Sequence, residues 1–180
     1  LDNLLQKDES LRKKVAVKIG LYCSGCHAKE ATTLSMEKSG IDLNNAERLY
    51  YRRGHWRGVS SVISKDEKEQ QFSYTKTICA YKNAYFFEKT SCMTCQDHFA
   101  LYADISFGDI WLKEMKGESI KHTSCVIRTK KAYAALQQAI EDKAIYATHI
   151  SDRDMVRSQK RALVFKFNLA KAKVKHLDKR

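Results

Sequence analysis

The residues best suited to chemistry are cysteines that stand in two pairs of identical spacing. Cys23 and Cys26 form one C-x-x-C pair, and Cys92 and Cys95 form the other. On a turn, this spacing lets two thiolates converge on one metal ion or cluster, because neither side chain has to cross a helix or a sheet. The alternatives are buried small hydrophobes and disulfides. Two such pairs in a chain of 180 residues favour a metal or cluster site.

The spacing leaves the identity of the metal open. A zinc ribbon has its two pairs about 15–20 residues apart, whereas 65 residues separate Cys26 from Cys92. The site would therefore join distant parts of a fold, and both zinc and iron–sulfur clusters accept four thiolates. Cys79 is interpreted either as a fourth ligand or as a core residue. Cys125 stands within an apolar stretch and is interpreted as structural.

A strand and a helix are expected to position the first pair. Residues 15–21 are apolar and β-branched, which predicts a strand that runs directly into Cys23. The spacing of apolar residues predicts a helix over residues 27–39, ended by Gly40. The first pair then lies on a turn between them, where side chains and amide N–H groups can face a ligand.

The rest of the chain reads as a mixture of strands and helices. Strands are predicted over residues 47–52, 59–63, 71–74, 103–112, 124–128 and 145–150, and helices over 76–87, 130–142 and 153–177. These predict an α/β or α+β fold, with a mixed sheet, flanking helices and a C-terminal basic helix. At this length we expect one domain over residues 1–150 and a basic helical extension over residues 151–180.

The net charge of +12 suggests nucleic acid, but its distribution argues against that partner. Residues 151–180 contain ten Lys or Arg against three Asp, so +7 of the charge lies on this segment. A solvated helical face or a docking surface for an acidic partner explains it better. No stretch approaches the ~18 apolar residues of a membrane span. Because the first residue is Leu1, we also expect the chain to begin inside a longer protein.

Four stretches resemble, in order, motifs of one known family. Residues 91–97 read S-C-M-T-C-Q-D and residues 103–111 read A-D-I-S-F-G-D-I-W. They are similar to the C-x-x-C-x-D and A-D-I-S-x-G-D-x-W stretch of the coenzyme F-420 hydrogenase/dehydrogenase beta-subunit family, in its C-terminal domain. Residues 18–23, K-I-G-L-Y-C, resemble the family's strand that ends in a cysteine, and residues 125–129, C-V-I-R-T, resemble its V-x-R-T strand. The C-x-x-C-x-D and A-D-I-S-x-G-D-x-W stretch is the specific one.

The resemblance implies a 4Fe-4S cluster held by Cys23, Cys92 and Cys95, with Cys26 as the fourth ligand. It further implies a flavin, FAD, in many members, and electron exchange with coenzyme F-420. Five residues of the matching stretches are candidates for binding such a cofactor: Asp104, Ser106, Gly108, Asp109 and Arg128. Arg128 could hold a phosphate or carboxylate of the flavin or of coenzyme F-420, or it could pair with Asp104 or Asp109 as part of the fold. No catalytic residue is assigned.

Two departures limit what the resemblance implies. Lys130 stands where the family has a glycine after the R-T pair, and the family's longer N-terminal half is missing. A complete flavin or coenzyme pocket is therefore not expected in this chain alone.

The main functional hypothesis is a cytoplasmic electron-transfer domain that works with a redox partner subunit or a ferredoxin-like module. We expect its basic segment, residues 153–180, to be dispensable for cluster binding. The alternative hypothesis is a module with a structural zinc, or a scaffold without cofactor, that docks an acidic partner or nucleic acid.

Overall fold

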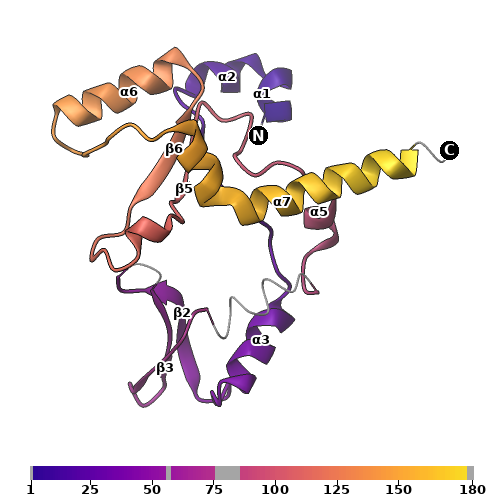
Figure 1. Ribbon diagram of the computed structural model, residues 1–180, viewed down its shortest axis with the longest axis vertical. Helices are drawn as coiled ribbons and strands as arrows, with labels where there is room; N and C mark the ends of the chain where they lie inside the picture. The colour runs from indigo at the N-terminus through magenta and orange to yellow at the C-terminus, as the bar shows by residue number, and fades with distance from the viewer. Residues whose placement is uncertain (1, 56–57, 76–85, 178–180) are drawn as a thin grey trace. The chain divides into compact units, whose positions relative to one another are not determined.

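The computed structural model describes residues 2–55, 58–75 and 86–177, and Figure 1 labels most of their helices and strands. They divide into two compact units. The first unit comprises Leu1–Ser24, Gln96–Leu112 and His122–Arg180, and the second comprises Gly25–Cys95 and Lys113–Lys121. Most of the helix predicted over residues 76–87, including Cys79, lies outside the described residues.

A mixed sheet of three strands forms the centre of the first unit. Its strands are β1 (Ile19–Leu21), β5 (Ile105–Asp109) and β6 (Thr123–Ile127). β5 lies in the middle, parallel to β1 and antiparallel to β6. The A-D-I-S-x-G-D-x-W motif therefore supplies the central strand, and Cys23 lies two residues beyond the end of the neighbouring strand β1.

Four helices complete the first unit: α1 (Asp2–Lys7), α2 (Glu9–Lys14), α6 (Lys130–Glu141) and α7 (Asp152–Leu177). The carboxylate of Asp8 accepts a hydrogen bond from Leu11 N at 2.9 Å and so caps α2. The hydroxyl of Thr129 accepts one from Ala132 N at 3.4 Å at the start of α6. The predicted basic C-terminal helix is confirmed as α7.

The second unit packs one helix on an antiparallel sheet. The helix is α3 (Lys29–Lys38), and the sheet has the order β2 (Ala46–Arg53), β3 (Val59–Ser64), β4 (Glu69–Phe72). Their shared core consists of Met36, Ile41 and Val62, with Leu43, Ala46, Leu49 and Phe72 packed against it. The short helix α5 (Thr90–Thr94) and a 3-10 turn, η1 (Lys113–Met115), also belong to this unit.

The predicted fold class is confirmed, but one predicted strand is wrong. Residues 145–150 form neither helix nor strand, and Tyr146 is 92% exposed. Apolar and β-branched residues alone are insufficient for a strand, because a strand also needs a neighbour to complete its hydrogen bonds. The strand predicted over residues 15–21 is also shorter than expected and begins only at Ile19.

Within the part of the chain that the structure describes, no helix has the length and apolar character required to cross a lipid bilayer.

Candidate metal centre

One residue of each cysteine pair meets the other in the second unit. The amide N–H of Cys26 donates to the sulfur of Cys92, with 3.2 Å between N and Sγ. Two backbone hydrogen bonds hold the segments together on either side: Ala28 N donates to Phe87 O at 2.7 Å, and Lys89 N donates to Cys26 O at 3.0 Å. The fold thus brings together two cysteines that are 66 positions apart in the sequence.

A close contact between two side chains, His27 and Glu88, lies beside this junction. His27 and Glu88 form an isolated antiparallel bridge, and the Nε2 atom of His27 lies 3.0 Å from Oε1 of Glu88, whose side chain is only 1% exposed. The Glu88 carboxylate fills the space in front of Gly25, which has a φ of +144°. Sequence reasoning missed Glu88, because only the pairing of the two segments reveals that it faces the glycine of the first C-x-x-C pair.

Replacing Gly25 by alanine is expected to destabilise this junction by about 1–3 kcal/mol and to lower metal retention. A side chain is strained at this φ, and its Cβ would overlap the buried Glu88 carboxylate. Gly117→Ala is the matched control, since Gly117 also has a positive φ, +99°, but no atom lies within 4 Å of an added Cβ. Urea unfolding and metal analysis of both variants check this prediction. Equal effects in the two variants would rule out a specific role for the overlap.

The remaining two cysteines of the pairs lie in different units. Cys95 caps the end of α5 in the second unit, where its N–H donates to Cys92 O at 3.2 Å. Cys23 belongs to the first unit, where its N–H donates to His98 O at 2.9 Å. Of the four paired cysteines, Cys92 is half-buried and the other three are exposed.

The paired cysteines are of the donor type that a thiolate-bound centre uses, and the structure brings two of the four predicted ligands, Cys26 and Cys92, into contact. Accessible thiols are the ligands that zinc and iron–sulfur clusters require, and an amide N–H directed at a ligand sulfur is typical of cluster sites. The juxtaposition of Cys26 and Cys92 provides one such N–H···S contact. Across residues 2–55, 58–75 and 86–177, no three His, Cys, Asp or Glu side chains are grouped as a complete set of metal ligands. The four-cysteine ligand set therefore stays a prediction.

Cys125 is not one of the paired cysteines, and its environment differs from theirs. It is a half-buried residue of β6, and burial raises the pKa of its thiol above the ordinary value of 9.0. A thiol that resists deprotonation is a poor metal ligand and nucleophile. This environment suits the structural role predicted for Cys125.

The Arg128 side chain forms hydrogen bonds within the first unit. Its guanidinium donates to Phe99 O at 2.8 Å and to Ser106 Oγ at 3.0 Å, and Ser106 is fully buried. A longer contact of 3.5 Å reaches Ala103 O. These contacts tie the loop before β5 to the end of β6. A contact between Arg128 or Ser106 and a flavin or coenzyme F-420 stays a prediction.

Asp104 fixes the start of β1 next to β5. Its Oδ2 atom accepts from Lys18 N at 2.7 Å and lies 3.0 Å from Lys131 Nζ. The residue is 5% exposed. Burial by itself would raise the pKa of Asp104, but the Lys18 N–H and the Lys131 ammonium outweigh it and hold the pKa below the ordinary value of 3.8. The buried carboxylate is therefore charged at neutral pH.

The change Asp104→Asn is expected to cost about 1.5–3 kcal/mol of stability at pH 7, the range for hydrogen bonds to a charged group. Because the folded pKa of Asp104 lies below 3.8, its contribution is present above about pH 4 and is lost as the pH falls through the folded value. Urea unfolding of the wild type and the variant should show a difference that shrinks on acidification. A difference that stays constant to low pH would contradict this account.

Gly108 and Asp109 also contact their own unit. A Cβ atom on Gly108 would overlap the ring of Tyr22, so the absence of a side chain lets that ring pack on β5. The backbone carbonyl of Asp109 accepts from Gln159 Nε2 of α7 at 2.6 Å. Cofactor binding by Gly108 and Asp109 is likewise still a prediction.

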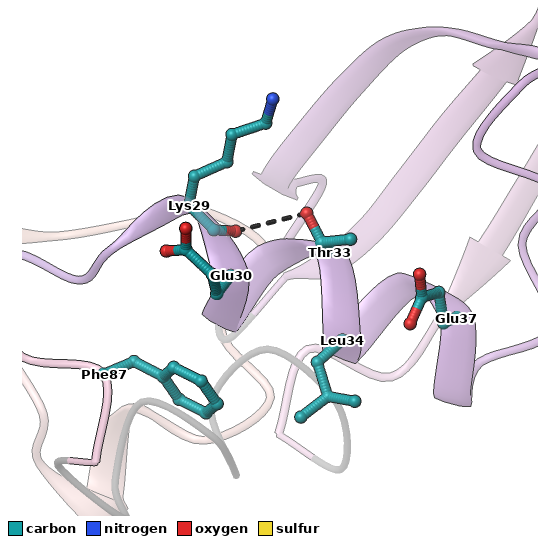
Figure 2. Close-up of a pocket in the computed structure, with 6 residues that line it drawn as sticks. All are labelled: Lys29, Glu30, Thr33, Leu34, Glu37 and Phe87. Atoms are coloured by element: carbon teal, nitrogen blue, oxygen red, sulfur yellow. Dashed lines mark hydrogen bonds between the residues drawn. The ribbon is translucent and has the colours of Figure 1, made fainter.

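A pocket of about 450 Å³ runs along α3 in the second unit. Figure 2 shows the residues that line it, with the Leu34 side chain and the Phe87 ring below the helix and the Lys29 side chain extending away from Phe87. Three further residues line it: Glu30, Thr33 and Glu37. None of the predicted ligands or cofactor-binding residues is among them.

The fold has a counterpart among solved structures. A chain of the F420-reducing NiFe hydrogenase complex from Methanosarcina barkeri matches with a TM-score of 0.54 and 21% sequence identity, over 88% of this chain and 50% of that chain. The present chain thus spans about half the length of that relative. No curated protein matches the sequence.

The sequence match assigns the chain to a family of domains found in hydrogenase and dehydrogenase beta subunits. Residues 1–153 match the family described as the C terminus of the coenzyme F420 hydrogenase/dehydrogenase beta subunit, and the chain belongs to this family. The resemblance seen in the sequence motifs is confirmed.

Proposed function

We propose that this chain is the electron-transfer domain of an iron–sulfur oxidoreductase, and that Cys23, Cys26, Cys92 and Cys95 hold a 4Fe-4S cluster. The observation that carries the proposal is the contact between the Cys26 amide and the Cys92 sulfur at 3.2 Å, which joins the two C-x-x-C segments. Family membership supports the redox assignment at the level of an oxidoreductase subunit.

Residues of this chain would stabilise the negative charge of a thiolate-bound cluster and fix the turn that carries Cys26. A 4Fe-4S cluster bound by four thiolates supplies one-electron transfer. The Cys26 N–H offsets charge on the Cys92 sulfur, as amide donors do around ligand sulfurs. Gly25 allows the turn to pass close to Glu88, and the antiparallel bridge between His27 and Glu88 fixes the turn to the segment before α5.

We propose that this chain alone does not exchange hydride with coenzyme F-420 or a nicotinamide. Such two-electron chemistry is supplied by a flavin. Arg128, the strongest candidate for holding FAD, already donates to Phe99 O and Ser106 Oγ. FAD and coenzyme F-420 would then bind only with further protein, in an assembly that includes a redox partner subunit or a ferredoxin-like module. We place this assembly in the cytoplasm.

Anaerobic reconstitution with iron and sulfide tests both parts of the proposal. After reconstitution, dithionite should bleach the visible absorption and air-free oxidant should restore it. FAD and coenzyme F-420 are then offered separately, and we expect neither to be retained in a stoichiometric amount. Failure to bleach would contradict the electron relay. Tight FAD binding with reduction of coenzyme F-420 would contradict the need for further protein.

A further inference from the structure

We propose that Gln159 of α7 is a positioning residue for Cys23 and acts through His98. The inference deepens the proposed function, because it concerns one of the four cysteines assigned to the cluster. All the residues involved belong to the first unit.

His98 holds the backbone of Cys23 at both of its polar groups. The N–H of Cys23 donates to His98 O at 2.9 Å, and His98 Nδ1 lies 3.1 Å from Cys23 O. The His98 residue is 6% exposed. Its ring also packs against the rings of Tyr22 and Phe99, with centroids 5.7 and 4.8 Å away. Movement of the imidazole would therefore move the Cys23 backbone.

Gln159 fixes the other side of the imidazole. Its Oε1 atom lies 3.1 Å from His98 Nε2, and its Nε2 atom donates to Asp109 O at 2.6 Å. Since a carbonyl oxygen can only accept, the Asp109 contact sets the amide orientation and directs Oε1 at His98 Nε2. Both ring nitrogens then face acceptor oxygens, and a neutral imidazole donates to one of the two. Gln159 is 5% exposed. A continuous series of contacts thus links the end of β5, the N-terminal part of α7 and the backbone of Cys23.

This series of contacts changes the expectation that residues 153–180 are dispensable for cluster binding. Gln159 lies within that segment, as does Met155, whose sulfur accepts from the Tyr22 hydroxyl at 3.9 Å. Most buried polar groups have a hydrogen-bond partner, and this series of buried contacts ends at Cys23, a predicted ligand. The turns of α7 up to Gln159 are therefore required, and dispensability applies to residues beyond them.

The test compares Gln159→Met with Lys160→Met. The first change removes the amide at similar volume, and the second places the same side chain at the exposed neighbouring position. In the metal-free proteins, hydrogen exchange at the Cys23 amide should be protected in the wild type and in Lys160→Met. In Gln159→Met it should be about tenfold faster, roughly the loss expected for one hydrogen bond. Wild-type Cys23 without protection, or equal exchange in both variants, would overturn the inference.

A second measurement distinguishes a positioning role of Gln159 from a purely stabilising role. It also keeps a failure of this inference distinct from a failure of the proposed function. In reconstituted protein, Gln159→Met should change the paramagnetic resonance spectrum of the reduced centre, while Lys160→Met should leave it unchanged. A lower unfolding temperature with an unaltered spectrum would reduce Gln159 to a structural residue and overturn the inference. If the wild type takes up no iron, the proposed function fails, and the exchange experiment on metal-free protein still decides whether Gln159 positions Cys23.

Discussion

Replacing Cys92 by serine is expected to reduce bound iron and sulfide to less than about a tenth of the wild-type amount, because one thiolate ligand is lost. The Cys26 amide, 3.2 Å from the Cys92 sulfur, would then face a serine oxygen in place of the sulfur. Iron and sulfide analysis after anaerobic reconstitution measures the effect. Cys125→Ser is the matched control, since Cys125 is a half-buried strand residue with a raised thiol pKa.

The control must retain iron for the comparison to hold, and circular dichroism should show that both variants remain folded. Full iron content in Cys92→Ser would remove Cys92 from the ligand set. Equal losses in the two variants would indicate a general effect on the fold rather than a lost ligand.

Arg128→Met is expected to lower the free energy of unfolding of the first unit by about 1.5–3 kcal/mol, the range for hydrogen bonds that involve a charged group. The change leaves Phe99 O and the buried Ser106 hydroxyl without the guanidinium that now donates to them. Urea unfolding at neutral pH measures the loss. Arg157→Met is the control: its salt bridge to Asp154, at 3.0 Å, lies at the surface, where such pairs contribute about 0–1 kcal/mol.

This variant also separates the two interpretations of Arg128 that the sequence leaves open. A large loss of stability supports the structural interpretation, although with Phe99 and Ser106 as partners instead of the carboxylates of Asp104 or Asp109. If Arg128→Met is as stable as Arg157→Met, the fold does not depend on Arg128. Cofactor binding would then be the better interpretation of Arg128.

The sequence predicted well those helices that are specified by signals within or next to their own segments. The apolar spacing of α7 and the position of Thr129 before α6 are local signals, and both helices form where expected. The prediction of a strand over residues 145–150 was wrong, because a strand needs a neighbouring strand and local composition does not reveal whether one is present. The helices α1 and α2 were missed, although Asp8 is a recognisable N-cap for α2.

The sequence indicated the cysteines of the candidate site but not the contacts that surround them. The C-x-x-C spacing identified the thiols, and the family motifs identified the central strand β5. Glu88, His98 and Gln159 carry no motif, because their roles depend on contacts across 61 to 75 positions of sequence. Such long-range partners of a ligand become visible only once the chain is folded.

Anaerobic metal analysis decides whether the four cysteines hold a 4Fe-4S cluster. The chain is purified without oxygen, reconstituted with iron, sulfide and zinc all available, and desalted before analysis. We predict about four iron and about four sulfide per chain, with little zinc. About one zinc per chain with no sulfide would contradict the account and favour a structural metal site.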